Sequence, residues 1–195
     1  METRMRLVGG NLALDFVNTR SGPDDDVLTD YPSLISWGLY AGALTEAEAA
    51  QLSPRAQAAF TRALHTRDYL DEVFRSVATG AEPAPSALTR LRDDEAEALA
   101  HAQLERGDTF TWSWRDDHSP DRPLRPVVHA AIELLTLRDL ARVKACGGCL
   151  FLFYDETKNR SRRWCSMQDC GTDAKMRRYI ATRRIRSSPD PRRAE

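Results

Sequence analysis

Four cysteines in two close pairs constrain the fold of this chain more than any other feature of its 195 residues. The first pair, Cys146 and Cys149, encloses two glycines, and the second pair, Cys165 and Cys170, begins after fifteen intervening residues. Two such pairs can place four thiolates tetrahedrally around Zn²⁺. Because four protein ligands leave no open coordination position, the spacing predicts one structural zinc ion rather than a catalytic one.

Other uses of the four thiols stay open at this point. Disulfides form in oxidising compartments, and we expect the protein not to be exported to one. Thiolates are also the species that oxidise, so a redox switch that releases zinc is a further alternative. No window approaches the roughly 18 consecutive apolar residues that cross a bilayer, and we therefore expect a cytoplasmic protein without a membrane partner.

The segments around the cysteines suggest the shape of the metal-binding module. The sequence LFLFYD between the pairs is typical of a short strand. The run after Cys170 is typical of a helix, capped by Thr172 or Asp173. We call each close cysteine pair with its turn a knuckle. The order knuckle, hairpin, knuckle and helix predicts a treble-clef or zinc-ribbon-like module over residues 144–187.

Charge divides the chain into two unlike parts, although the whole sequence has a formal net charge of -1. Residues 138–195 contain 15 lysines and arginines against 7 acidic residues, a net of +8, whereas residues 1–137 contain 13 against 22, a net of -9. A positive end joined to a negative body is expected when one part meets a polyanion, or when the two parts attract each other.

The basic side chains crowd the second cysteine pair and the helix behind it. We expect Tyr179 and Ile180 to pack inward from this helix, leaving its basic side chains for phosphate oxygens or guanine edges. A solvated basic face, with two or three charges balancing the thiolate cluster, is the simpler alternative. The candidate nucleic-acid contacts are Arg160, Arg162, Arg163, Lys175, Arg177, Arg178, Arg183 and Arg184, with Arg186 beside them.

Residues 1–143 read as a mainly helical domain with a small β element, which makes the whole chain α+β. Thr45 and Glu48 form a capping-box pattern, and Gly80 is placed to end a long helix that opens near Pro54. The remaining expected elements are a strand over 12–16, a helix from 88 closing near 107, a strand over 110–114 and a helix over 127–143 that leads directly into the first cysteine.

Polar residues beside the first predicted strand are candidates for a small-molecule effector site. Asn11, Asp15 and Asn18 could line such a site, although polar residues at a strand-to-loop junction more often cap turns. The four histidines are scattered singly, and none joins a catalytic constellation, so we expect no enzyme. The segment 188–195 has the composition of a disordered tail.

Two stretches resemble known families. The pattern from Cys146 to Arg184, with NRSRRWCSM at its centre, is similar to the CGNR zinc finger. The stretch GGNLALDFVNT resembles the start of the ABATE domain, which precedes that finger in bacterial proteins described as stress-induced transcriptional regulators. The resemblance implies a sensor domain followed by a DNA-binding finger.

One departure from the family pattern concerns DNA binding more than metal binding. The family reads Cys-Gly-Asn-Arg, whereas this chain has Thr172 and Asp173 where the family has Asn and Arg. The zinc ligand Cys170 is kept. The substitution removes a positive contact and adds a carboxylate, which is favourable at a helix N-terminus by about 0.3–1 kcal/mol.

The sequence therefore predicts a bacterial transcription regulator that binds double-stranded DNA through a basic helix on a zinc module. The N-terminal domain is expected to modulate that binding through a ligand or through a homodimer that matches a two-fold operator. A zinc-containing protein–protein interaction module without DNA binding is the alternative, since an acidic partner could use the same basic patch.

Overall fold

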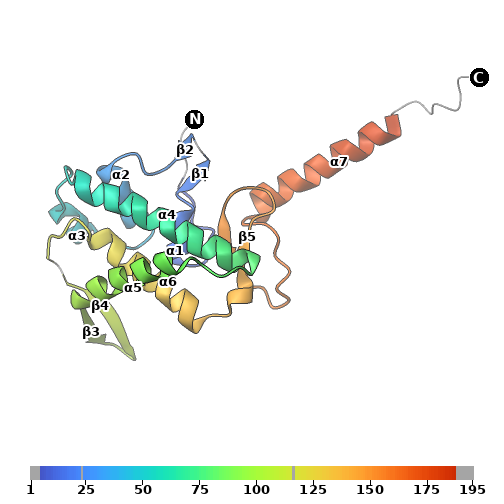
Figure 1. The fold of residues 1–195 in the computed structure, drawn as a ribbon. Coiled ribbons are helices and arrows are strands. Elements are labelled where there is room, and N and C mark those ends of the chain that lie inside the picture. The colour runs from blue at the N-terminus through green and yellow to red at the C-terminus, as the bar shows by residue number, and fades with distance from the viewer. Residues whose placement is uncertain (1–4, 23, 116, 188–195) are drawn as a thin grey trace, which may run out of the picture.

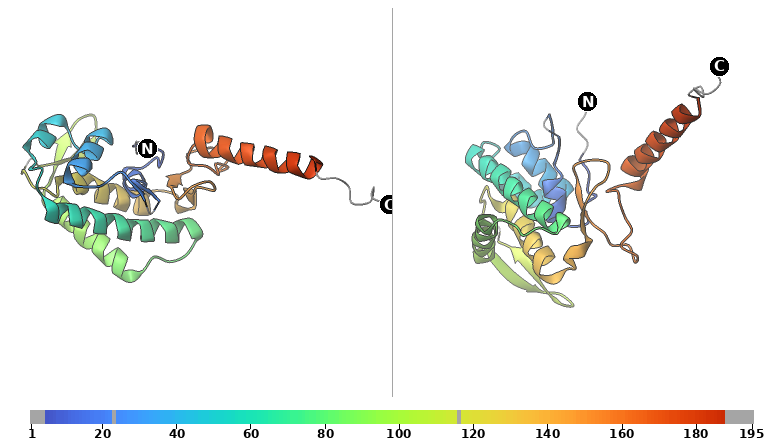
Figure 2. Two further views of the ribbon diagram at one scale, coloured as in Figure 1. Left: turned by 90° about the horizontal axis from the view of Figure 1, so that it is seen from above. Right: turned by 45° about the vertical axis from the view of Figure 1, so that its right-hand side comes forward.

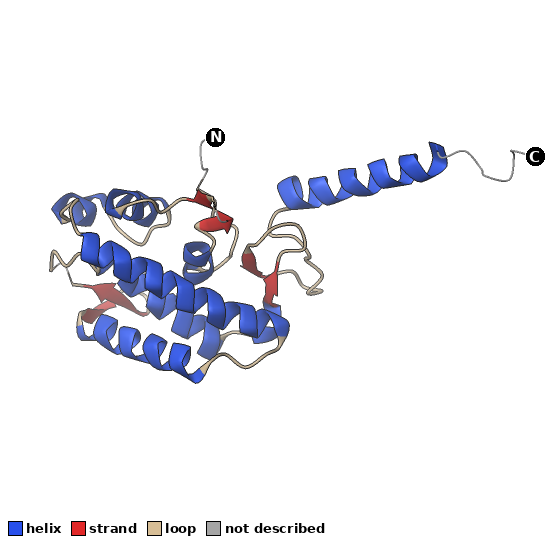
Figure 3. Ribbon diagram, turned by 45° about the horizontal axis from the view of Figure 1, so that its top comes forward, coloured by secondary structure: helices blue, strands red, loops and turns tan. Residues whose placement is uncertain are grey.

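The computed structural model describes residues 5–22, 24–115 and 117–187, so the expected tail at 188–195 lies outside the described residues. The fold is mainly helical with small two-stranded antiparallel sheets, which confirms the predicted α+β class. Figure 1 shows a helical body, a small module beside it and a last helix that projects away. Figure 3 shows that the strands lie at the margins of the helical body.

The first element is a helix, and the predicted strand over 12–16 is wrong. α1 (Leu12–Val17) begins at Asn11, whose side chain accepts a hydrogen bond from the backbone N–H of Ala13. An Asn N-cap and an almost fully buried helix explain the error, because a short helix buried on every side shows no helical period. The hairpin of β1 (Arg20–Gly22) and β2 (Asp25–Asp26) follows.

The next three helices build most of the body. They are α2 (Tyr31–Tyr40), α3 (Glu46–Gln51) and α4 (Gln57–Thr79). The predicted capping box at the start of α3 is confirmed, since Thr45 and Glu48 each accept a hydrogen bond from the other's backbone N–H. Gly80 ends α4 in the left-handed conformation at φ +73°, as predicted, and a side chain there would be strained.

α5 (Pro85–Ala100) is shorter than the predicted helix that closed near residue 107. Its C-terminal continuation is the strand β3 (Ala102–Arg106), which pairs with the correctly predicted strand β4 (Phe110–Trp114). Trp112 lies opposite Leu104 in this hairpin. Pairing with β4 overrides the helical pattern, because the backbone of β3 gains cross-strand hydrogen bonds over its whole length of Ala102–Arg106.

α6 (Arg125–Leu137) ends earlier than the predicted helix over 127–143 and does not lead directly into the cysteines. A 3₁₀ turn and the strand β5 (Val143–Ala145) intervene, and β5 pairs with β6 (Leu152–Tyr154). The core of the body contains Phe16 and Trp37, whose ring centroids lie 5.0 Å apart.

The small module is packed onto the body, and the last helix leaves it. Val143 and Leu152 of the β5–β6 hairpin belong to the core of the body, and β5 packs against α4. A π-helical turn, Met167–Gly171, continues into α7 (Thr172–Ser187). The two views of Figure 2 agree that α7 extends away from the helical body.

Candidate metal centre and basic surface

The four cysteines meet at one point from four different local structures. Cys146 follows β5, Cys149 lies in the turn before β6, Cys165 ends an irregular loop, and Cys170 lies in the π-helical turn. Their four Sγ atoms all lie within 4.8 Å of one another, with 3.5 Å between Cys149 and Cys165. The Sγ atoms of Cys165 and Cys170 are 3.8 Å apart.

This geometry fits zinc. Tetrahedral Zn–S bonds of about 2.3 Å require sulfur–sulfur distances of about 3.8 Å. The backbone N–H groups of Gly148 and Cys165 donate to Cys146 Sγ at 3.4 and 3.2 Å, which stabilises a thiolate there. The site is closed by four protein ligands, and the protein therefore has one structural zinc site.

The thiols influence one another's ionisation. Hydrogen bonding with Cys165 lowers the pKa of the Cys149 thiol to about 5, and the same hydrogen bond raises the pKa of Cys165. Burial raises the pKa of Cys170 to about 12. Thiols crowded this closely cannot all ionise unless a cation compensates their charge, which is what Zn²⁺ supplies in such a site.

The glycines of the knuckles leave room for one aromatic ring. A Cβ on Gly147 would lie 2.8 Å from the ring of Trp164, and one on Gly148 would lie 3.0 Å from Cys170 Cβ. A Cβ on Gly171 would lie 3.3 Å from the same ring. Trp164 therefore packs over the two cysteine pairs.

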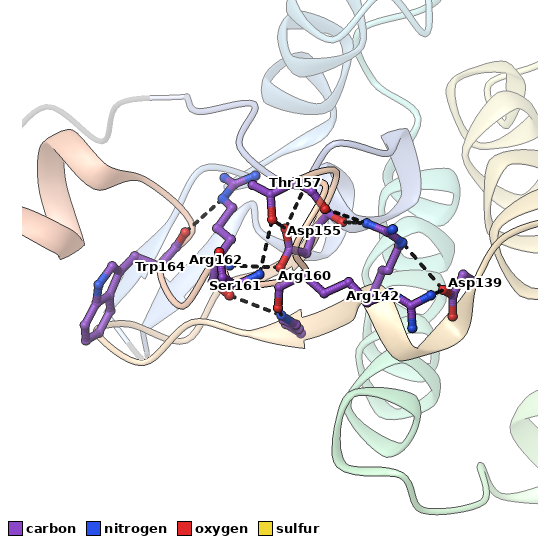
Figure 4. A network of polar contacts seen from close by, with 9 residues as sticks. Asp139, Arg142, Asp155, Thr157, Arg160, Ser161, Arg162 and Trp164 are labelled. Atoms are coloured by element: carbon purple, nitrogen blue, oxygen red, sulfur yellow. Dashed lines mark hydrogen bonds and ion pairs between the residues drawn. The ribbon is translucent and has the colours of Figure 1, made fainter.

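A buried carboxylate organises the loop between β6 and Cys165. Asp155 is fully buried and accepts a hydrogen bond from Lys144 Nζ at 2.7 Å. The backbone N–H groups of Thr157 and Arg162 also donate to Asp155, at 3.0 Å each (Figure 4). Burial opposes ionisation of Asp155, but these hydrogen bonds outweigh it and hold the pKa of its carboxyl below the usual range. Sequence reasoning missed Lys144 and Asp155, although the position of Asp155 directly after a buried strand was a usable signal.

Arg162 is directed into the module rather than toward solvent. Its Nε donates to the carbonyl of Trp164 at 2.9 Å, and its Nη2 donates to the carbonyls of Val8 and Cys165. Its guanidinium also lies over the ring of Phe153, 4.6 Å from the centroid. Arg162 thus holds the backbone around a zinc ligand, so most of its donors are already engaged.

Arg160 is also engaged within the protein. Its guanidinium pairs with Asp139 at 2.7 Å, and its backbone lies in the left-handed region at φ +50° (Figure 4). Arg142, which precedes β5, also fastens this loop, because its Nη1 donates to the carbonyls of Asp155 and Thr157 at 2.7 and 2.9 Å. Two of the predicted nucleic-acid contacts therefore have structural partners.

The remaining predicted contacts lie on the surface. Arg163 is exposed with its guanidinium 5.8 Å from the ring centroid of Trp164. On α7, the exposed basic residues are Lys175, Arg177, Arg178 and Arg183, the last of which lies over Tyr179. The side chains of Arg184 and Arg186 fall outside what the structure describes.

Two details predicted for α7 are wrong. Helical structure begins at the π-helical turn, where Ser166 accepts from the backbone N–H of Asp169, so neither Thr172 nor Asp173 is the cap of the combined segment. Tyr179 and Ile180 do not pack inward, since 58% and 44% of their surfaces are exposed. The helix projects away from the body and has no facing core to receive them.

The candidate effector residues have partners inside the protein. Asn18 donates to the carbonyl of Leu152 and accepts from its N–H, both at 2.8 Å, while Asn11 donates to the carbonyl of Ala130 at 3.2 Å. Asp15 accepts from Gly9 N–H at 2.7 Å, and burial raises the pKa of its carboxyl to about 6.

The N-terminal segment also binds the zinc module directly. Tyr154 N–H donates to the carbonyl of Gly9 at 2.7 Å. Arg6 pairs with Asp169 beside the second knuckle, and its guanidinium lies 5.8 Å from the ring centroid of Phe151. These contacts join the N-terminal segment to the zinc module, and the sequence contained no local signal for them.

One of the four histidines packs against the tryptophans of the β3–β4 hairpin. His129 of α6 lies edge-on to Trp112 and Trp114, and its Nδ1 is 2.7 Å from Glu95. His65 is exposed on α4. None of these contacts forms a nucleophile–base arrangement among the described residues.

Comparison with protein families accounts for nearly the whole chain. Residues 10–137 match the model of ABATE, described as "Putative stress-induced transcription regulator". The chain belongs to the ABATE family. Residues 142–183 of this ABATE protein match the CGNR zinc finger, in spite of Thr172 and Asp173. The two matches confirm the predicted architecture.

The matched families are a regulator family and a zinc finger, not enzyme families. No curated protein matches the ABATE chain. Among the described residues, none of the helices is long and apolar enough to cross a membrane. The predicted boundary between residues 143 and 144 stays a prediction, and β5 (Val143–Ala145) spans it.

Proposed function

We propose that this ABATE protein regulates transcription in the cytoplasm by binding double-stranded DNA through α7. The observation that carries the proposal is the position of Lys175, Arg177 and Arg178, which are exposed on a helix that projects from the body (Figure 2). A projecting basic helix can approach a duplex without a clash from the rest of the protein. Its side chains can then neutralise phosphates on the DNA backbone.

The contacts between body and module support modulation by the N-terminal domain. Asn18 is buried and makes two hydrogen bonds to Leu152 of β6, and β6 leads into the loop that carries Cys165. A ligand that moves α1 would therefore also move β6 and the cysteine loop from which α7 projects. This is the physical route by which an effector would change the orientation of the helix.

The test is binding of the zinc-loaded full chain to a random duplex library across salt concentrations. We expect a steep salt dependence, and replacement of both Arg177 and Arg178 by Ala should reduce the slope of log K against log salt by about 1.8, since each phosphate contact contributes about 0.9. An Arg90→Ala/Arg92→Ala variant of α5 removes the same charge from a remote exposed surface and should keep the slope.

Two results would contradict the proposal. Equal slopes for the α7 and α5 double variants would show that α7 is not the contact surface. Absence of binding at every salt concentration, with one zinc bound per chain, would favour the alternative of a protein–protein interaction module.

A further inference from the structure

The exposed face of α7 carries an apolar stripe that the positive charge of the helix does not explain. Met176, Tyr179 and Ile180 are 55%, 58% and 44% exposed. Their spacing of three and four residues places them on one face of the helix. Three large apolar side chains on one projecting face indicate a contact surface, because scattered single residues would need no explanation.

Basic residues flank this stripe on both sides. With about 100° between successive residues, Lys175 lies on one side of the stripe and Arg177 on the other, whereas Arg178 lies toward the opposite face. Lys175 and Arg177 are exposed. Arg183 follows the stripe one turn further on, with its guanidinium over Tyr179. The stripe is therefore apolar over its length, with one basic residue on each margin and a third at its C-terminal end.

A DNA major groove has the complementary arrangement. The groove is about 12 Å wide, so an α-helix fits with its centre at the base edges and its margins beside the two phosphate backbones. The apolar group displayed on base edges in this groove is the 5-methyl group of thymine. A central apolar stripe with basic margins therefore matches thymine methyl groups between two rows of phosphates.

We propose that Met176 and Ile180 read thymine methyl groups in the major groove, with Tyr179 packing beside them. This inference rests on the proposed DNA binding and adds the base feature that α7 recognises. The charge around the stripe favours DNA over a second copy of the helix, because two such faces packed together would bring Lys175, Arg177 and Arg183 close to like charges.

The experiment uses the duplex most enriched from the library, or a mixed-sequence duplex if none is enriched, and the same duplex with every thymine replaced by uracil. This replacement removes the methyl groups and keeps the phosphates and the base pairing. We expect the wild-type protein to bind the uracil duplex about fourfold more weakly for each methyl group that it buries.

Variants connect this loss to the stripe. A Met176→Ala/Ile180→Ala protein should bind the thymine duplex more weakly and should bind both duplexes equally. The matched control is Leu104→Ala, because Leu104 is 55% exposed on the β3–β4 hairpin. This control should discriminate thymine from uracil as the wild type does.

The outcomes separate this inference from the proposed function. Salt-dependent binding with equal affinity for the two duplexes would overturn the thymine inference and leave DNA binding intact. No binding to either duplex at low salt, with zinc bound, would overturn both. If the stripe instead mediates self-association or binding to vesicles containing phosphatidylglycerol, the double variant would abolish that activity while thymine and uracil duplexes bind alike, which would also overturn the inference.

Discussion

The loop before Cys165 and the helix after Cys170 are equally rich in arginine in the sequence, yet two of the three loop arginines are engaged within the protein, whereas the described arginines of the helix are exposed. In the loop, Arg162 donates to three backbone carbonyls and Arg160 pairs with Asp139. On α7, Arg177 and Arg178 are exposed on a projecting helix. The difference teaches that arginines close together in the sequence are available to a ligand only where no carboxylate or carbonyl of the protein already binds their side chains.

Loss of a zinc ligand should have the largest effect on stability, because the metal holds the loop and α7 together at Cys165 and Cys170. We expect Cys165→Ser to lose zinc and to unfold the module, since structural zinc contributes about 10–16 kcal/mol in zinc-finger peptides. Metal analysis and circular dichroism check this, with Met167→Ala as a control at an exposed position of the same module. Full zinc retention in the serine variant would contradict the four-cysteine site.

Replacing single arginines should separate the internal from the exposed positions. Arg162→Ala leaves the carbonyls of Val8, Trp164 and Cys165 without a donor and should cost about 2–4 kcal/mol of unfolding free energy. The neighbouring exposed Arg163→Ala should cost less than about 1 kcal/mol. Urea unfolding with zinc in excess measures both, and equal losses would show that the two arginines do not differ in role.

The pH dependence of stability tests the buried carboxyl of Asp15, which holds the N-terminal segment at Gly9. The folded pKa of Asp15 is raised to about 6 by burial, above the usual value of about 4, so its ionisation destabilises the folded state as pH rises through this interval. Asp15→Asn should therefore gain about 1 kcal/mol relative to wild type between pH 5 and pH 7.5, with a plateau above that. A difference independent of pH in urea unfolding would exclude a raised pKa.

The smallest expected effect on stability is on α7. Arg177→Ala removes an exposed side chain and should change the unfolding free energy by less than about 0.5 kcal/mol. The same change should reduce the salt slope of DNA binding by about 0.9. A large loss of stability would show that Arg177 has a partner within the fold, which would remove the contrast with the loop.

Much of the fold followed from local patterns. Thr45, Glu48 and Gly80 mark helix ends through hydrogen bonds and backbone conformation within a few residues. The sequence of β4 alternates aromatic and hydroxyl residues, which is a local signal for a strand. Errors arose where partners distant in the sequence decide the structure. α1 is buried on all sides, and the segment after α5 becomes β3 because β4 pairs with it.

The sequence by itself identified the four cysteines as candidate zinc ligands, because two close pairs at this spacing can surround one metal ion, and the structure brings their Sγ atoms together. Only the tertiary structure decided which arginines are available for a ligand. Asp139 and the backbone carbonyls that accept from the loop arginines are brought there by the packing of β5 and β6 on the body. Charge can be counted along a chain, but whether a charge is already paired depends on which groups folding places within a few ångströms of it.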